Sequence, residues 1–307
     1  MTAPRGARAA RVAAQAKVNL RLRILAREAS GYHQLETLFL RLTLADQLLV
    51  RITDGSRSLD VSGDVDRDAL GPADRNLAWR AAESYARVTG WPSGFSIELE
   101  KRIPIGGGLG GGSADAGAVL RALDAMSPTP IGEPALLALA AELGADVPFL
   151  ATSHAFALGW GRGERLLALP APPVRELLLL IPAFSVETAT AYGWLAAARE
   201  SSVATRDPIS VLDLGALNDW RTLSTLATND FEPVVGERHP QITALLAQLR
   251  AAHCVPALMS GSGSTVFGVL PERDFELPRF KEDIGGLAPR VVLTRSAADV
   301  EPVIGVE

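Results

Sequence analysis

The stretch Pro104-Ile105-Gly106-Gly107-Gly108-Leu109-Gly110-Gly111-Gly112-Ser113 holds six glycines in ten residues. Glycine loses more conformational freedom on folding than any other residue, so this density indicates positive φ angles or close approach of the backbone to another group. Residues 95–100, before the loop, alternate apolar and polar side chains as a half-buried strand does, and residues 113–125 follow as a helix. A loop of free N–H groups that leads into a helix N-terminus predicts a phosphate-binding cradle.

Two well-known nucleotide loops fit this stretch poorly. Gly106, Gly108 and Gly111 satisfy the dinucleotide fingerprint G-x-G-x-x-G, but the first strand of such a unit is buried on both faces and does not alternate. No strand ending in an acidic residue follows about 20 residues later, as that fingerprint requires. A P-loop needs a lysine immediately before its serine or threonine, and Gly112 precedes Ser113. The sequence therefore predicts a phosphate cradle of a third kind.

Strand patterns also lie upstream of the loop. Residues 12–24 alternate as a half-buried strand, which places Lys17 and Asn19 together on its exposed face. Residues 47–52 and 58–61 predict two further strands, joined through Asp54-Gly55 as a hairpin.

Helices and strands are expected along the rest of the chain, in an order that does not alternate regularly. The predicted helices are residues 76–88, 134–143, 187–199, 215–227, 240–252 and one more between the last two strands, and the predicted strands are 177–181, 265–270 and 291–294. This grouping favours an α+β protein in two lobes over a doubly wound parallel sheet. The proline-rich residues 170–173 mark a candidate boundary, and the two domains are expected to be 1–165 and 166–307.

The composition restricts the partners and the compartment. A net charge of −5, with 48% hydrophobic and 21% charged residues, is typical of a globular protein and argues against nucleic acid or an anionic membrane as a partner. Cys254 is the only cysteine, which excludes an internal disulfide and a cysteine-built metal site and fits a reducing compartment. The longest strongly apolar run, residues 177–181, is far too short to span a bilayer. We expect a cytoplasmic protein.

Two glycine segments resemble those of the GHMP family of small-molecule kinases. Residues 104–110 resemble the family's loop Pro-x-x-x-Gly-Leu-Gly, and residues 259–267, Met-Ser-Gly-Ser-Gly-Ser-Thr-Val-Phe, resemble its C-terminal motif, which packs near the first loop. The resemblance implies a two-lobed GHMP kinase fold, with an N-terminal ATP-binding and catalytic domain and a C-terminal domain that contributes to substrate binding. It also implies ATP with Mg²⁺ as the phosphoryl donor.

Further motifs are similar to one branch of that family. Residues 16–20, 31–39, 107–113 and 144–149 resemble the kinases that phosphorylate the 2-hydroxyl of 4-diphosphocytidyl-2-C-methyl-D-erythritol in the non-mevalonate isoprenoid route. A GHMP kinase for another acceptor, such as mevalonate or homoserine, is the first alternative, and the Gly-Tyr-His at the start of 31–39 disfavours it. A non-catalytic GHMP-fold ligand sensor is the second, and it is disfavoured because both expected catalytic residues are present.

The resemblance also implies roles for single residues. Asp146 becomes the general base and Lys17 the lysine that polarises the hydroxyl and the transferring phosphoryl group. From the residues alone, Asp146 could instead be a helix N-cap, and Lys17 would usually be a solvated charge. The residues assigned to the acceptor are Asn19, Tyr32, His33, Thr188 and Tyr192, of which the last two could instead pack a helix. The residues assigned to ATP are Asn76, Lys101, Pro104, Ile105, Gly106, Gly107, Gly108, Leu109, Gly110, Gly111, Gly112, Ser113 and Ala114, of which Lys101 could instead be a surface charge.

The chain departs from the family pattern just after the loop. Gly111 and Gly112 stand where relatives place a hydroxyl that helps to hold magnesium, and Ala114 replaces a serine common in this branch. The sequence therefore predicts no particular magnesium ligand, and it contains no feature that predicts an oligomeric state.

Overall fold

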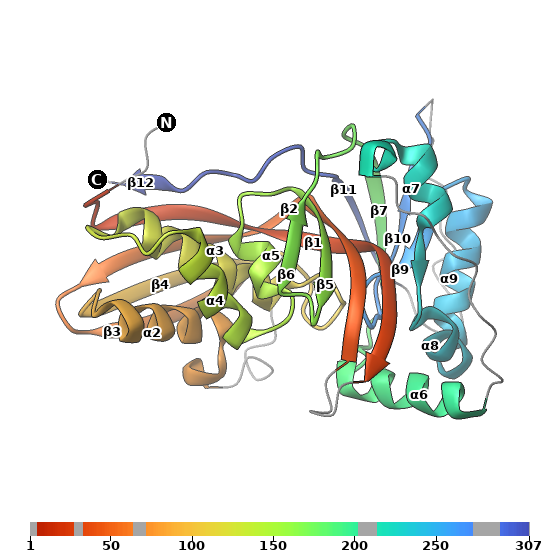
Figure 1. Cartoon of the computed structure of the whole chain (residues 1–307), viewed down its shortest axis with the longest axis horizontal. Coiled ribbons are helices and arrows are strands. Elements are labelled where there is room, and N and C mark those ends of the chain that lie inside the picture. Colours follow the sequence, from red (N-terminus) through yellow and green to blue (C-terminus); the bar gives the residue numbers. More distant parts are fainter. Residues whose placement is uncertain (1–4, 28–32, 64–71, 202–213, 273–288, 307) are drawn as a thin grey trace.

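The computed structural model describes residues 5–27, 33–63, 72–201, 214–272 and 289–306, which form two sheets with helices packed on them (Figure 1). The first sheet contains β1 (Ala9–Arg27), β2 (His33–Thr53), β3 (Arg57–Gly63), β4 (Gly94–Lys101), β5 (Phe156–Gly161), β6 (Arg165–Ala168), β8 (Thr228–Asn229) and β12 (Ile304–Val306). The second contains β7 (Glu176–Ile181), β9 (Ala257–Met259), β10 (Val266–Val269) and β11 (Arg290–Arg295). The helices are α2 (Leu77–Thr89), α3 (Gly111–Met126), α4 (Glu133–Leu143), α5 (Val147–Ala151), α6 (Thr188–Ser201), α7 (Trp220–Leu226), α8 (Glu232–Arg238) and α9 (Pro240–Ala251), with short 3₁₀ turns η1 (Ala73–Arg75) and η2 (Leu214–Ala216).

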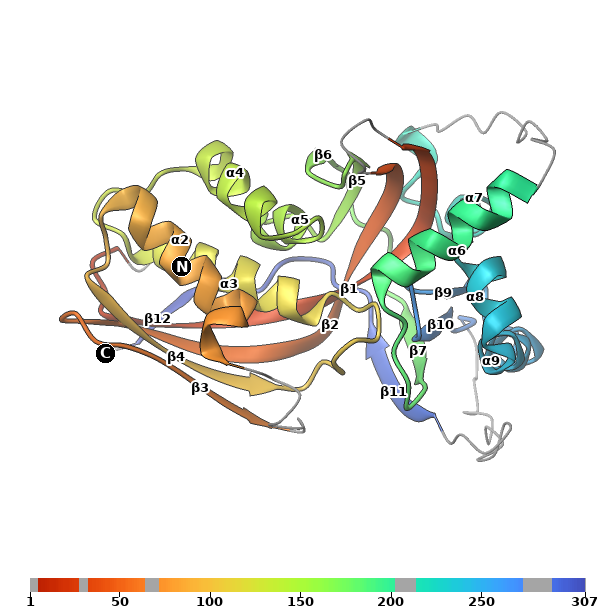
Figure 2. The same ribbon diagram turned by 90° about the horizontal axis from the view of Figure 1, so that it is seen from below.

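The first lobe is the first sheet with α2 to α5 lying on one of its faces (Figure 2). Strand β4 alternates as predicted: Phe95, Ile97 and Leu99 are buried toward the helices, whereas Glu98 and Glu100 are exposed. The glycine loop connects the end of β4 to the start of α3, so the predicted strand, loop and helix are confirmed.

The predicted hairpin between residues 47–52 and 58–61 is wrong. Both strands exist, but β4 lies between them: it pairs antiparallel with β2 on one side and parallel with β3 on the other. The Asp54-Gly55 turn therefore carries the chain to the far edge of β4, and the better partner for β2 is the strand with the buried Phe95, Ile97 and Leu99.

The second lobe is the second sheet with α6, α8 and α9. Its strand β7 is buried on both faces: Leu177 and Leu179 belong to the core of the first lobe, whereas Leu178 and Leu180 pack in the core of the second. This explains the unbroken apolar run, because a strand between two cores has no polar face. The mixed α+β class and the two lobes are thereby confirmed.

The two lobes share strands. Both β8 and β12, from the C-terminal half of the chain, pair with β1 in the first sheet. The predicted division between residues 165 and 166 stays a prediction. The single helix expected over residues 215–227 is wrong, because Asp219 caps a new helix by accepting a hydrogen bond from the Thr222 N–H and so separates η2 from α7.

The long strands β1 and β2 run from the first lobe into the second (Figure 1). Their pairing contains irregularities between Gln15 and Lys17 and between Asn19 and Arg21. The face expected to be exposed is buried, with Lys17 and Asn19 each 2% exposed, because it turns toward the loop and α5 instead of solvent. Within the described ranges, no helix has the length and apolar character needed to cross a membrane.

Candidate active site

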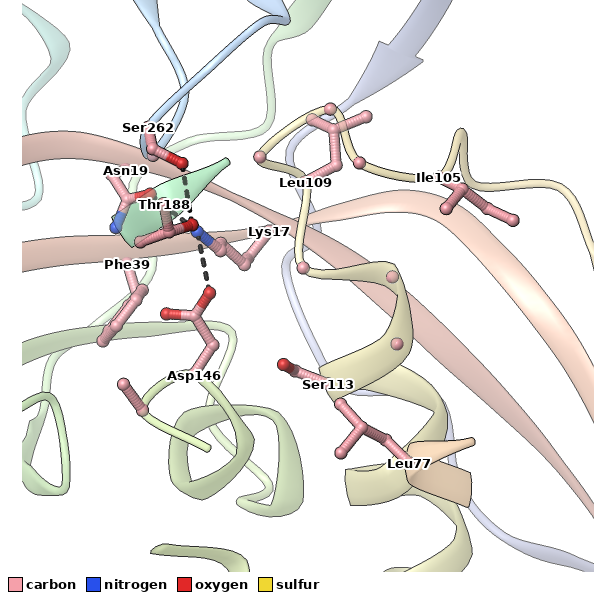
Figure 3. A pocket seen from close by; sticks show the side chains of 18 of the residues that line it. Lys17, Asn19, Phe39, Leu77, Ile105, Leu109, Ser113, Asp146, Thr188 and Ser262 are labelled. Atoms are coloured by element: carbon pink, nitrogen blue, oxygen red, sulfur yellow. Dashed lines mark hydrogen bonds and ion pairs between the residues drawn. The ribbon is translucent and has the colours of Figure 1, made fainter. Parts of the chain in front are cut away.

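A pocket of about 580 Å³ lies where the glycine loop, the middle of β1 and β2, the start of α5 and the start of α6 meet (Figure 3). Its lining comprises Lys17, Asn19, Leu22, Leu35, Thr37, Phe39, Arg75, Asn76, Leu77, Lys101, Pro104 to Ser113, Asp115, Ala145, Asp146, Arg162, Thr188, Tyr192, Phe231, Gly261 and Ser262. Residues from both glycine segments therefore line the same space, although about 150 residues separate the segments in sequence.

The pocket holds a buried lysine against a partly exposed carboxylate. The Lys17 Nζ lies 3.1 Å from Asp146 Oδ2, and the Asp146 side chain is 32% exposed whereas that of Lys17 is 3% exposed. Lys17 Nζ also donates to Asn19 Oδ1 at 2.7 Å, and Asn19 Nδ2 donates in turn to Thr37 Oγ1 at 2.8 Å. This chain of hydrogen bonds fixes the ammonium group and leaves one carboxylate face open to the pocket.

Asp146 stands directly before α5 in the N-cap position, but its side chain makes no capping hydrogen bond. The carboxylate is instead directed toward Lys17 (Figure 3). The helix-capping alternative for Asp146 is therefore not what the structure shows, and the carboxylate is available for chemistry in the pocket.

Hydrogen bonds to backbone carbonyls of the first glycine segment join it to the second. The Thr265 N–H donates to the Gly107 carbonyl at 3.2 Å, and Ser260 Oγ donates to the Gly108 carbonyl at 2.9 Å. The Lys17 N–H donates to the Leu109 carbonyl at 3.0 Å, which ties the loop to β1. Because donors of the protein hold the carbonyls of Gly107, Gly108 and Leu109, the protein itself fixes the shape of the loop.

Gly108 has a φ of +77°, and a Cβ there would lie 2.1 Å from the Ser260 carbonyl oxygen. We expect Gly108→Ala to push the two segments apart and weaken binding of a non-hydrolysable ATP analogue by roughly tenfold or more, since backbone strain of this kind costs about 1–3 kcal/mol. Calorimetry measures the affinity. Gly132→Ala is the matched control, because its φ is +78° but a Cβ there meets nothing within 4 Å. Unchanged affinity in Gly108→Ala would contradict the assignment of this loop to the nucleotide site.

Lys101 lines the pocket from the end of β4, but two carboxylates hold its ammonium group. It donates to Asp46 and, at 2.7 Å, to Asp115 Oδ2, and all three side chains are at most 5% exposed. Asp46 Oδ1 also accepts from the N–H groups of Arg102 and Ile103, at 2.5 and 2.7 Å. The cluster thus joins the start of the loop to the first turns of α3.

Burial alone would lower the pKa of Lys101, but the neighbouring charges of Asp115 and Asp46 outweigh it and raise that pKa. For Asp115, burial has the opposite effect and raises the pKa of the carboxyl group, although the charge of Lys101 opposes this rise. The surface-charge alternative for Lys101 is excluded by its 6% exposure. Its assignment to ATP stays a prediction.

Of the other residues assigned to ATP, all but Ala114 line the pocket. Asn76 lines the pocket and caps α2, its Oδ1 accepting from the Ala78 N–H at 2.9 Å. Residues 104–113 all line the pocket, whereas Ala114 is buried in the first turn of α3 and does not. A Cβ at Gly112 would meet nothing nearer than Leu77 Cδ1 at 3.6 Å, so packing does not demand a glycine there and its small size leaves room at the α3 N-terminus.

Three of the residues assigned to the acceptor, Asn19, Thr188 and Tyr192, line the pocket. Thr188 Oγ1 and Ser262 Oγ share a hydrogen bond of 3.0 Å, which joins α6 to the second glycine segment. Tyr192 lines the pocket, and its ring stacks on that of His33 with 4.5 Å between centroids. His33 itself does not line the pocket, and Tyr32 lies outside the described residues.

Tyr192 is also packed from its edge by Phe231, with 4.9 Å between the ring centroids. Burial, with a smaller contribution from the charge of Asp146, raises the pKa of Tyr192 to about 12. Its phenol is therefore neutral across the physiological range, and the residue presents a ring and a hydroxyl rather than a charge.

Several pocket residues were missed by the sequence analysis. Thr37 and Phe39 sit two residues apart on β2, and Phe39 pairs with Asn19 across the sheet, so strand register could have found them. Arg162 lies in a turn between two glycines with positive φ, Gly161 and Gly163, a pattern typical of an exposed hairpin tip that presents its central side chain.

Magnesium ligands do not form a ready-made cluster. No group of three or more histidine, cysteine, aspartate or glutamate side chains suited to a metal ion occurs in the described part of the chain. The Ser113 hydroxyl and the Asp146 carboxylate face the same space (Figure 3). These oxygen donors fit a Mg²⁺ ion that is carried mainly by nucleotide phosphates, as is usual for this metal.

Comparison with known proteins agrees with this geometry. Residues 76–156 match the GHMP kinases N terminal domain, and residues 213–277 match the GHMP kinases C terminal family. A homoserine kinase from Cytophaga hutchinsonii, 18% identical, shares the fold with a TM-score of 0.67 over 97% of this chain and 98% of its own. The loop, the lysine-carboxylate pair and these matches define a GHMP-type small-molecule kinase.

Two further matches identify one branch of the GHMP kinases. A 4-diphosphocytidyl-2-C-methyl-D-erythritol kinase of Anaeromyxobacter sp. (strain K) is 44% identical over 267 residues, which cover 85% of this chain and 80% of that protein. A crystal structure of a 4-(cytidine 5'-diphospho)-2C-methyl-D-erythritol kinase is 36% identical, with a TM-score of 0.67 over 84% of this chain and 89% of that one. The chain belongs to the 4-diphosphocytidyl-2-C-methyl-D-erythritol kinase family.

Proposed function

We propose that this protein transfers the γ-phosphoryl group of ATP to the 2-hydroxyl of 4-diphosphocytidyl-2-C-methyl-D-erythritol, a step of non-mevalonate isoprenoid synthesis, and that it does so in the cytoplasm. The observation that carries the proposal is the Lys17–Asp146 pair, 3.1 Å apart, in one pocket with a glycine loop that leads into the α3 N-terminus. A base, a cation and a phosphate cradle are the parts that phosphoryl transfer to an alcohol requires.

The loop and the start of α3 bind the phosphates in this proposal. Free N–H groups of the loop and the helix N-terminus donate to phosphate oxygens, while the loop's carbonyls at Gly107, Gly108 and Leu109 are already bonded to protein. The gap left by Gly112 admits the phosphate chain close to the helix. When bound, Mg²⁺ supplies neutralisation of phosphate charge, with Ser113 and Asp146 as the oxygen donors within reach.

Asp146 and Lys17 carry the chemistry. The open face of the Asp146 carboxylate takes the proton of the acceptor hydroxyl, whose oxygen bonds to the γ-phosphorus as the bond to the β–γ bridging oxygen breaks and ADP departs. Lys17 stabilises the negative charge that develops on the transferring group, since its ammonium is buried at 3% exposure and held by Asn19.

The cytosine of the acceptor stacks on Tyr192 in this account. We expect Tyr192→Ala to raise the acceptor KM roughly 5- to 150-fold, the equivalent of the 1–3 kcal/mol that base stacking on an aromatic side chain contributes, with the ATP KM nearly unchanged. Tyr192→Phe restores the KM, because the ring face stacks. Steady-state kinetics with each substrate varied gives both constants.

Tyr85→Ala is the control for loss of a tyrosine ring. Tyr85 is fully buried and donates to Asp124 Oδ1 at 2.9 Å, away from the pocket lining, so its loss lowers the melting temperature without a selective change in acceptor KM. If Tyr192→Ala raised both substrates' KM equally, the stacking role would be wrong.

An ADP-release assay over a set of acceptors tests the proposed function. The cytidine-linked acceptor is compared with free methylerythritol, mevalonate and homoserine at equal concentrations. We expect turnover only with the cytidine-linked compound. Preference for mevalonate or homoserine would place the chain among kinases with which it shares the fold at 18% identity or less, and no turnover with any of them would favour a ligand sensor.

A further inference from the structure

Arg41 is a deeply buried cation that the proposed chemistry does not use. Its side chain is 1% exposed and donates to three backbone carbonyls, from Nε to His154 at 2.9 Å and from Nη2 to Phe149 and Thr152 at 2.8 and 3.0 Å. Burying a guanidinium group costs much free energy unless its donors are satisfied. Of the three acceptors, Phe149 belongs to α5, whereas Thr152 and His154 follow its last residue, Ala151.

α5 is the five-residue helix that directly follows Asp146. Lys17 and Arg41 are directly opposite each other in the antiparallel pairing of β1 with β2. Like charges in that arrangement destabilise a sheet, so each cation needs its own partner. Lys17 binds Asp146 before the helix, and Arg41 binds one carbonyl within the helix and two that follow it, so that one cross-strand pair of cations holds α5 from both sides.

A column of rings fills the space between the two cations. The Arg41 guanidinium lies 4.9 Å from the centroid of Phe149, and Phe149 stacks on Phe39 at 4.8 Å with an interplanar angle of 11°. Lys17 Nζ lies 5.9 Å from the centroid of Phe39. Contacts of a cation with a ring face and of stacked rings are both attractive at these distances. The column therefore sets the spacing between α5 and β2.

We propose that Arg41 is a positioning residue, which acts through α5 and Phe149 to hold Asp146 at its working distance from Lys17. This inference rests on the proposed function. A displacement of about 1 Å in a reacting group can cost roughly 100-fold in rate. Lysine cannot replace Arg41, because a single ammonium group does not present the planar fork that reaches three carbonyls and stacks on a ring.

The test compares Arg41→Lys and Phe149→Leu with the wild-type protein. We expect each variant to lower kcat roughly 10- to 100-fold per folded molecule, with KM for ATP and for the acceptor changed by less than about threefold. The folded fraction is measured by circular dichroism and by the stoichiometry of ATP-analogue binding. A merely structural role would lower the folded fraction but leave kcat per folded molecule unchanged.

Arg121→Lys is the matched control. Arg121 is another arginine that donates to backbone carbonyls, those of Ala13 at 2.9 Å and Glu301 at 3.1 Å, and burial lowers its pKa to about 10. It does not line the pocket. Its replacement should lower the melting temperature and leave kcat per folded molecule unchanged.

Wild-type kcat per folded molecule in Arg41→Lys would overturn the proposal. If Arg41→Lys does not fold, Phe149→Leu decides by the same criterion. A wild-type protein that turns over a different acceptor overturns the proposed function alone, and the kcat comparison is then made with that acceptor. A crystal structure of either variant with Lys17 and Asp146 still 3.1 Å apart would overturn the positioning role whatever the acceptor is.

Discussion

Asp146→Asn should lower kcat by roughly 10² to 10⁴, which corresponds to about 3 to 5.5 kcal/mol in the activation barrier. The amide keeps the size of the side chain but cannot accept the hydroxyl proton. Affinity for an ATP analogue measured without Mg²⁺ should change little, because the loop is held by the second glycine segment and by β1 rather than by Asp146. Stopped-flow or coupled measurement of ADP release, with calorimetry for the nucleotide, separates the two effects.

Asp219→Asn is a matched control for this substitution. Asp219 also precedes a short helix, but its side chain caps that helix by accepting from the Thr222 N–H and it does not line the pocket. We expect unchanged kcat there, because asparagine caps a helix about as well as aspartate. Near-normal turnover in folded Asp146→Asn would contradict the general-base role.

Lys101→Met should reduce the free energy of unfolding by about 3 to 5 kcal/mol, the usual range when one partner of a buried ion pair is removed. The reason is the pair of carboxylates it leaves behind: Asp46 retains two backbone donors, whereas Asp115 loses the bond at its Oδ2 while its Oδ1 is already without a hydrogen-bond partner. Urea unfolding followed by circular dichroism measures the loss.

Two further variants decide whether the loss comes from the buried Asp115 carboxyl group that is left without a partner. Arg102→Met, at the neighbouring position, breaks only an exposed pair with Glu100 and should change stability little. Adding Asp115→Leu to Lys101→Met should recover part of the stability, since a buried carboxyl group without a hydrogen-bond partner is removed. An equal loss in Arg102→Met, or no recovery in the double variant, would show that Lys101 does not stabilise the fold through this cluster.

Structural features that depend on residues close together in the sequence could be predicted from it. The glycine loop between β4 and α3 follows from glycine density and from the alternation of Phe95, Ile97 and Leu99, because both express requirements of neighbouring residues along the chain. The pocket brings Lys17 and Asp146 together as the family resemblance implied, although their roles stay predictions until they are measured.

Features that depend on distant pairing were not predictable in the same way. β4 lies between β2 and β3 because it pairs better with β2 than β3 does, and no turn sequence indicates which of the two strands becomes the partner of β2. The burial of Lys17 depends on α5 and the loop closing over β1, so periodicity indicated an exposed face. Arg41 resembles any polar residue of an alternating strand until the carbonyls of the α5 end are placed around it.

Phosphorus-31 NMR of the reaction mixture shows whether the phosphoryl group reaches the 2-hydroxyl of the cytidine-linked acceptor. Carbon 2 of the methylerythritol bears a methyl group and no hydrogen, whereas the other free hydroxyls are on carbons that bear hydrogen. We expect a new phosphomonoester resonance without three-bond coupling to a proton, formed together with ADP by the wild-type protein and at least about 100-fold more slowly by Asp146→Asn. A proton-coupled phosphomonoester resonance, or ADP without any new phosphomonoester, would contradict it.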